Sequence, residues 1–183
     1  IYVRSNNQQI FILSDEDEKS LRRRSDVASI RIKEFVSKPV MGYSRIYNRK
    51  DIGKALEEAK RALETAKTMN MSSQNYDPLS VLQLLLTVKD TQEAHDFYRA
   101  YVDAIRQKAS VENLKEILMT MESYVAHSGN FQAAAREMNQ HENTIRYRVN
   151  KVKSALGMEN DNVKFHETVA VAVKLRTLIN EKL

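Results

Sequence analysis

Residues that interrupt helices are scarce in this chain. Its 183 residues include only 4 glycines and 2 prolines, and these are the two residue types least favourable to a helix interior. With 42% hydrophobic and 29% charged residues, the chain can bury a core and still present a polar surface. The length fits one large domain or two small ones. We therefore expect a mainly α protein.

Several kinds of chemistry have no support in the sequence. There are no cysteines, which excludes disulfides and cysteine-based metal or nucleophilic sites. Four isolated glycines cannot form a phosphate-binding loop. No apolar run approaches the roughly 18–20 residues of a membrane span, and no secretory signal is present. The four histidines lack metal-ligand spacing: His95, His127, His141 and His166. We expect a cytoplasmic protein that is not an enzyme and has no metal site or cofactor.

The first 69 residues mix strand and helix patterns. β-branched and aromatic residues at 1–3 and 10–13 flank a polar turn, which is typical of a hairpin, and "PVMGYS" indicates another strand. Asp15 and Asn48 are the expected N-caps of two helices, whose inward residues would be Leu21, Ala28, Ile32 and Phe35, then Ile52, Ala55, Leu56, Ala59, Leu63 and Ala66. This order predicts the end of an α/β or α+β domain. Because Ile1 already lies in a strand-like run, we expect an upstream part to be missing.

Only helical patterns follow the polar segment 70–77, which we expect to be a linker. Asp77 and Pro78 predict the start of a helix, and Asp90 with Glu93 resembles a capping box. The inward residues of that next helix would be Ala94, Phe97, Tyr101 and Ile105. A helix at 112–127 would stop at Ser128-Gly129-Asn130, and an apolar helix at about 165–178 would be buried or lie at a subunit contact. Residues 78–183 therefore predict an all-α domain.

Two short helices at about 131–156 have the spacing of a helix-turn-helix. In the first, Phe131, Ala134, Ala135 and Met138 would face inward, and the alanines would let the two helices approach closely. A turn at 139–141 leads into a second helix at about 141–155. Its apolar seam would consist of Ile145, Val149, Val152 and Leu156.

The face opposite that seam carries amides, hydroxyls and one aromatic ring, edged by cations. Residues 130–157 hold five Lys or Arg and two Glu, which gives this segment a net charge of +3. That is more than half of the net charge of +5 carried by the whole chain. Asn143 could pair with adenine and Arg146 with guanine or phosphate, while Arg148, Lys151 and Lys153 would contact phosphates. The candidate DNA-binding residues are Gln140, His141, Glu142, Asn143, Thr144, Arg146, Tyr147, Arg148 and Lys151. The alternative is a solvated surface without a nucleic-acid partner.

The stretch "AAAREMNQHENTIRYRVNKVKSALG" resembles the C-terminal helix-turn-helix of the PucR/CdaR transcription regulators. The family pattern His-x-Asn-Thr-(Leu/Ile)-x-Tyr-Arg is met by His141, Asn143, Thr144, Ile145, Tyr147 and Arg148. The resemblance implies a bacterial regulator that binds double-stranded DNA as a homodimer, with a small-molecule effector sensed by an upstream domain. Glu142 departs from the family, in which a basic or polar residue is frequent at that position.

The first 69 residues resemble the GGDEF family of nucleotide cyclases. The similarity lies in an Arg before the hairpin turn, the strand ending "GYS" and the helix "ALEEAKRALETAK". The GGDEF letters would fall near Asn6 to Ile10, where both glycines are replaced and the acids are amides, which are poor ligands for a hard cation. The resemblance implies a degenerate GGDEF-like domain without cyclase chemistry. Two alternatives stay open: a nucleotide-binding receptor or cyclase-like protein, and a structural protein-interaction domain.

Overall fold

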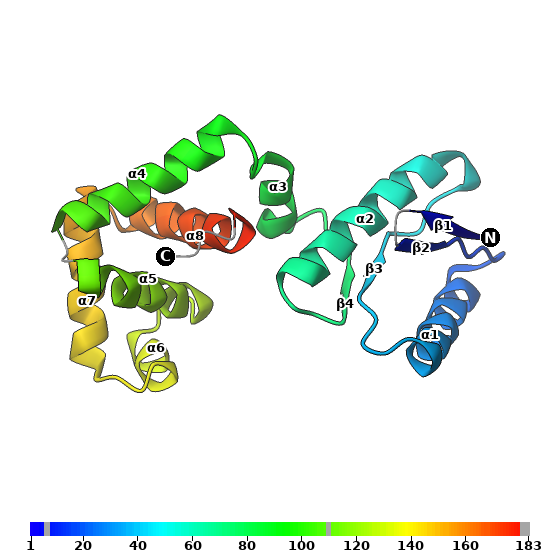
Figure 1. The fold of residues 1–183 in the computed structure, drawn as a ribbon, viewed down its shortest axis with the longest axis horizontal. Helices are drawn as coiled ribbons and strands as arrows, with labels where there is room; N and C mark the ends of the chain where they lie inside the picture. The colour runs from blue at the N-terminus through cyan, green and yellow to red at the C-terminus, as the bar shows by residue number, and fades with distance from the viewer. Residues whose placement is uncertain (6–7, 109–110, 180–183) are drawn as a thin grey trace. The chain divides into compact units, whose positions relative to one another are not determined.

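The computed structural model describes residues 1–5, 8–108 and 111–179. They fold into two compact units, Ile1–Pro78 (unit 1) and Leu79–Leu183 (unit 2) (Figure 1). The described part contains eight α-helices and four short strands. The mainly α architecture expected from the scarcity of glycine and proline is therefore confirmed.

Unit 1 combines a hairpin, two helices and a second pair of strands. The strands β1 (Tyr2–Ser5) and β2 (Gln8–Phe11) pair antiparallel, as the sequence pattern predicts. They are followed by α1 (Glu18–Phe35), β3 (Met41–Tyr43), the short 3₁₀ helix η1 (Arg49–Asp51), α2 (Ile52–Thr68) and β4 (Ser73–Asn75). β3 and β4 pair in parallel. The turn at which the GGDEF letters would fall lies partly outside the described residues.

Several features of unit 1 differ from the sequence expectations. Ile52, predicted to face inward, is 43% exposed, and Asn48, predicted as an N-cap, makes no side-chain cap hydrogen bond. The N-cap of α1 is Asp17, whose side chain accepts from the Ser20 N–H at 2.8 Å, while Asp15 pairs with Arg24. This Ser20 hydrogen bond lowers the pKa of Asp17. Phe35 is 83% exposed, not inward. Part of the expected linker forms β4, because pairing with the open edge of β3 satisfies backbone groups despite the polar composition.

A glycine allows β3 to lie directly against α2. A Cβ atom at Gly42 would be 2.2 Å from the backbone nitrogen of Leu63 and 2.3 Å from the carbonyl oxygen of Ala59. No side chain fits at such distances, so either the strand or the helix would have to move. Among the described residues of unit 1, the buried apolar side chains lie on the same helix, at Ala62 and Ala66.

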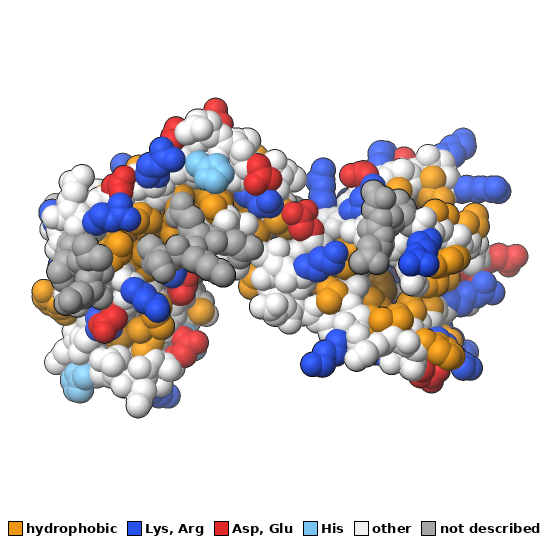
Figure 2. Space-filling model, viewed as in Figure 1, with side chains coloured by type: hydrophobic (Ala, Val, Ile, Leu, Met, Phe, Trp, Pro, Cys, Tyr) orange, Lys and Arg blue, Asp and Glu red, His pale blue; other side chains and the backbone are white. Residues whose placement is uncertain are grey.

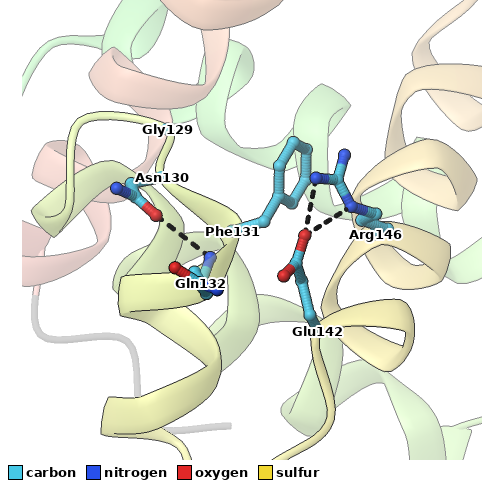
Figure 3. A pocket seen from close by; sticks show the side chains of 6 residues that line it. All are labelled: Gly129, Asn130, Phe131, Gln132, Glu142 and Arg146. Atoms are coloured by element: carbon cyan, nitrogen blue, oxygen red, sulfur yellow. Dashed lines mark hydrogen bonds and ion pairs between the residues drawn. The ribbon is translucent and has the colours of Figure 1, made fainter.

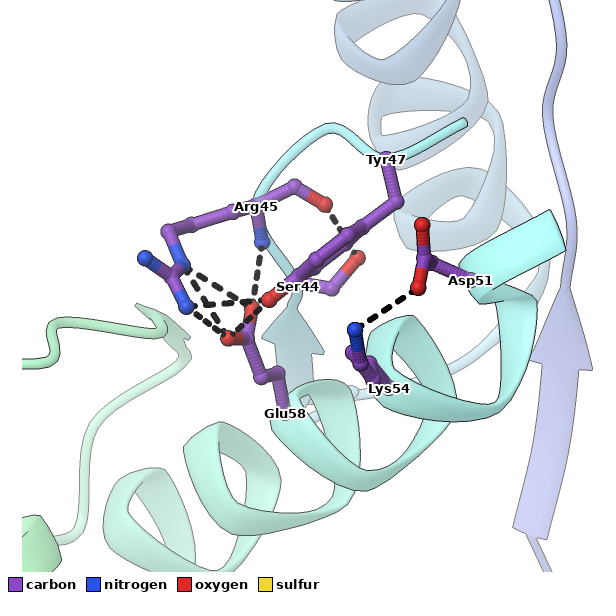
Figure 4. A network of polar contacts seen from close by, with 6 residues as sticks. All are labelled: Ser44, Arg45, Tyr47, Asp51, Lys54 and Glu58. Carbon is purple, nitrogen blue, oxygen red and sulfur yellow. Dashed lines mark hydrogen bonds and ion pairs between the residues drawn. The ribbon is translucent and has the colours of Figure 1, made fainter. Parts of the chain in front are cut away.

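The loop after β3 is fixed to α2 by Glu58 (Figure 4). The Arg45 side chain pairs with this carboxylate, the Arg45 backbone N–H donates to it at 3.1 Å, and the Tyr47 hydroxyl donates at 2.5 Å. Burial alone would raise the pKa of Glu58, but the hydrogen bonds from Arg45 and Tyr47 outweigh burial and lower it. The charged form of Glu58 therefore holds this loop.

Apolar side chains of unit 1 are exposed to solvent, and Figure 2 shows them among its Lys and Arg side chains. Helix α1 contains no buried residue. The exposed large apolar residues of this unit include Ile1, Tyr2, Val27, Ile30, Phe35 and Ile52.

Unit 2 is an all-helical bundle around one apolar core. Its helices are α3 (Val81–Val88), α4 (Gln92–Lys108), α5 (Val111–Ala126), α6 (Phe131–Glu137), α7 (Glu142–Leu156) and α8 (Asn162–Ile179). Helix α7 packs on α4, α5 and α6, while α8 packs on α3, α4 and α5. The largest fully buried side chains of this unit are Tyr98, Phe165, Ile105, Leu118, Met121, Ile145 and Leu175. Among the described residues, no helix is both long and apolar enough to cross a membrane.

The helix starts in unit 2 also differ in detail. Ser80, rather than Asp77, caps α3 by accepting from the Gln83 N–H at 3.3 Å. At the start of α4, the Thr91 hydroxyl accepts from the Ala94 N–H at 3.3 Å, so the cap lies one residue beyond Asp90. Within α4, Phe97 was expected to face inward but is 39% exposed, and its neighbour Tyr98, at 2% exposed, is buried instead. A hydroxyl that follows an acid in the sequence can therefore take over the cap.

Candidate nucleic-acid interface

A tight turn joins α6 to α7. The Asn130 side chain caps α6 by accepting from the Gln132 and Ala133 N–H groups, each at 3.0 Å. After α6, Asn139 takes a left-handed conformation with φ 52°, which asparagine tolerates better than most residues. The Gln140 N–H then donates to the Ala135 carbonyl at 2.9 Å. This geometry is the predicted helix-turn-helix arrangement, with α7 as the second helix.

Helix α7 is held by a fully buried seam. Ile145, Val149 and Val152 are each 0% exposed, which confirms the predicted inward face. Gly157 ends the helix in a left-handed conformation with φ 65°. The Lys108 ammonium group donates to the Ser154 carbonyl at 2.8 Å, where the C-terminal end of the helix favours a cation.

The start of α7 has a cap that sequence reasoning missed. His141 lies just before the helix, and its Nδ1 accepts from the Asn143 N–H at 3.2 Å. Histidine is not among the residues that commonly signal an N-cap. From the sequence alone, His141 is therefore predicted only as a candidate DNA contact.

The opposite face of α7 is open to solvent. Five of the predicted site residues are exposed: Gln140, His141, Asn143, Arg146 and Tyr147. The other four are partly exposed: Glu142, Thr144, Arg148 and Lys151. The ring of Tyr147 is prominent at 65% exposure. The structure thus brings these candidates together on the turn and one helix.

Two of the cations expected to contact phosphates have partners inside unit 2. The Arg148 side chain is 15% exposed, pairs with Glu116 of α5 and donates to the Thr120 hydroxyl at 3.3 Å. Lys153 donates to the Asn162 side chain at 2.5 Å. Within the described residues, Lys151 takes part in no hydrogen bond or ion pair. Of these three side chains, Lys151 is therefore the one left for an external anion.

Arg146 lies on the edge of α7 that faces α6 (Figure 3). Its Nε and Nη2 atoms donate to Glu142 Oε1 at 2.8 and 2.6 Å. Its guanidinium carbon lies 4.2 Å from the centre of the Phe131 ring. These side chains border an open cavity of about 400 Å³, which is also lined by Gly129, Asn130 and Gln132. Sequence reasoning placed Phe131 in the core and missed its contact with Arg146.

Among the described residues, no group of three or more His, Cys, Asp or Glu side chains is placed to hold a metal ion. The polar side chains on the open face of α7 are mainly hydrogen-bonding amides, hydroxyls and cations, with one carboxylate at Glu142. These groups suit the base edges and phosphates of a nucleic acid.

Comparison with protein families identifies a known domain in unit 2. Residues 117–175 match the PucR C-terminal helix-turn-helix domain. The match includes all of α6 and α7 and most of α5 and α8. This match suggests a DNA-binding transcription regulator, and it agrees with the resemblance of His141 to Arg148 to the PucR helix-turn-helix.

The comparison with curated proteins found no match, and the comparison with solved structures found none either. The family match does not extend into unit 1. The GGDEF-like character of the first 69 residues therefore stays a prediction.

Proposed function

We propose that unit 2 binds DNA sequence-specifically, with the exposed face of α7 in the major groove, and that the chain is a cytoplasmic, non-enzymatic transcription regulator. The observation that carries this proposal is the two-sided character of α7. Its inner seam is fully buried, so the helix is rigidly held, while its outer face presents amides and hydroxyls beside the charged side chains of Glu142, Arg146 and Lys151. A rigid helix with such a face suits direct contact with base edges.

The residues of the face divide by chemistry. Asn143 is exposed in the first turn of α7, the part of a recognition helix that reaches base edges. Its amide matches the donor and acceptor pattern of adenine. Lys151 lies more than two turns further along and would hold a phosphate. Because Arg148 is engaged with Glu116 and Thr120, we assign it to holding α7 on α5.

The function is tested by selection from a random duplex pool at near-physiological salt, followed by sequencing. We expect the wild-type chain to enrich one motif and Asn143→Ala to reduce discrimination at one base pair by about 1–3 kcal/mol. Asn150→Ala is the matched control, because Asn150 is exposed on the same helix two turns further on. It should leave the motif unchanged.

The selection also tests assembly. We infer that two copies bind together, so that the enriched motif is a palindrome whose half-sites lie roughly 34–36 Å apart or a multiple of that distance. A single half-site would contradict the dimer but not DNA binding. Retention of all duplexes alike, equal in wild type and Asn143→Ala, would contradict sequence-specific binding.

A further inference from the structure

We propose that Glu142 and Phe131 are positioning residues that make Arg146 a reader of bases rather than a holder of phosphates. This inference rests on the proposed function of α7 and assigns roles within it. It starts from the fact that the guanidinium group of Arg146 is contacted on two sides: a carboxylate binds one edge, and an aromatic ring lies against one face (Figure 3).

The contacts leave one edge of the guanidinium free. The group has five N–H donors, and Glu142 Oε1 takes one from Nε and one from Nη2. The two N–H groups of Nη1 and the second one of Nη2 remain. One N–H of Nη1 and the remaining N–H of Nη2 lie parallel on this free edge. Two parallel donors have the geometry that pairs with O6 and N7 of guanine. The open cavity beside Arg146 leaves room for a partner to approach.

An equivalent pair on α1 shows what is special about Arg146. Glu18 is the first residue of α1, as Glu142 is of α7, and Arg22 donates to Glu18 Oε1 from Nε and Nη2 at 2.9 and 2.6 Å. The side chains of Arg22 and Glu18 are 70% and 62% exposed. Those of Arg146 and Glu142 are less exposed, at 51% and 31%. Only the α7 pair has a ring beneath it, at Phe131. Arg146 is therefore more restricted than an ordinary surface arginine.

The carboxylate also acts on the partner. Glu142 lies in the first turn of α7, where exposed backbone N–H groups would otherwise attract phosphate oxygens. A negative charge at that place repels the phosphate backbone of any sequence equally, but it leaves a neutral base edge acceptable. Glu142 thus lowers affinity for all DNA by repulsion, and it raises discrimination by orienting Arg146 toward a base edge.

The test compares variants of the whole 183-residue chain in the same duplex selection. Arg146→Ala first identifies the base pair that Arg146 reads, as the position whose preference it abolishes. We expect Glu142→Gln to weaken preference at that same position and to lower the ratio of enriched-duplex to random-duplex affinity about three- to tenfold. Phe131→Leu should weaken the same position without raising affinity for random DNA, since it removes the ring and leaves the charge.

Glu18→Gln is the matched control, because it removes one charge from the same helix position with the same arginine partner geometry. It should leave the affinity ratio within about twofold of wild type. Circular dichroism confirms that each variant is folded before its binding is compared.

Three results would overturn the inference. One is that Glu142→Gln behaves like Glu18→Gln. Another is that Glu142→Gln alters a different base pair from Arg146→Ala, since Glu142 would then read a base itself. The third is that Arg146→Ala weakens all sequences alike, which would make Arg146 a phosphate contact. In each case the wild-type motif survives, whereas failure of the proposed function would show as no wild-type motif at all.

Discussion

The two units of the chain bury their apolar side chains to very different extents. In unit 2, side chains from α4, α5, α6, α7 and α8 form one continuous core, and the seam of α7 is fully enclosed in it. In unit 1, the buried apolar residues among the described part are Ala62 and Ala66, and α1 buries none. Unit 1 is instead held by the close approach at Gly42 and by the carboxylate of Glu58.

This difference teaches where each kind of substitution acts. The geometry of α7 is set by a core within unit 2, so a change on its outer face should leave the fold intact and alter only the DNA contacts proposed for that face. In unit 1 a few contacts hold the described elements together, so a single substitution at one of them has a large structural effect.

The largest effect is expected from Val149→Asp in the core of unit 2. Val149 is 0% exposed, and an unpaired carboxylate there costs about 4 kcal/mol or more of the free energy of unfolding. Thermal unfolding by circular dichroism should show loss of the unit 2 transition, and DNA binding should disappear with it. The control is Asn150→Asp, which places the same residue on the exposed neighbour and should shift stability by less than about 0.5 kcal/mol. Equal effects of the two variants would refute the assigned seam.

The next effect is expected in unit 1, from Gly42→Ala. The added Cβ would lie 2.2 Å from the Leu63 nitrogen, and separating β3 from α2 should cost about 1–3 kcal/mol. Gly53→Ala is the control, because nothing lies within 4 Å of a Cβ there and alanine is favourable in a helix. Proteolysis of unit 1 should accelerate for Gly42→Ala alone. If that variant also lost the enriched DNA motif, the independence of unit 2 would be contradicted.

A smaller, pH-dependent effect is expected from Glu58→Gln. The folded-state pKa of Glu58 lies below its ordinary value of 4.5, so its charged form stabilises unit 1 above that pH. The contribution is lost as the pH falls through the folded-state pKa. The variant should lose about 1–2 kcal/mol of the free energy of unfolding at neutral pH. The loss stays this small because Arg45 is half exposed, so water screens its attraction to Glu58. Unfolding followed between pH 7 and 3 should depend less on pH than in wild type; an unchanged pH profile would contradict the role of Glu58.

The sequence was most informative where periodicity is long. The apolar spacing of Ile145, Val149 and Val152 predicted the inner face of α7, and Gly157 predicted its end. These predictions hold because a helix that packs on three others must place apolar residues at 3.6-residue intervals. The family match then supports DNA binding for the same segment.

The sequence was least informative where a single contact determines the local structure. Pattern alone does not show that Arg148 reaches Glu116, because that pairing depends on how α5 packs against α7. The strand β4 is only three residues long and all three are polar, so its formation depends on pairing with the free edge of β3. The caps at Asp17, Ser80 and Thr91 moved by one to three residues for a similar reason, since several neighbouring side chains compete for the same N–H groups.

The smallest effect, and the sharpest division within α7, is expected from Lys151→Ala. Lys151 has no ion pair among the described residues, so its loss should leave unfolding unchanged but remove one phosphate contact. The slope of log affinity against log salt should then fall in magnitude by about 0.9, equally for enriched and random duplexes. Arg148→Ala, one turn away, should do the reverse: it loses about 1 kcal/mol of stability with its Glu116 and Thr120 contacts and keeps the salt slope. If the two variants shift the slope alike, both cations contact DNA, and the intramolecular assignment of Arg148 is wrong.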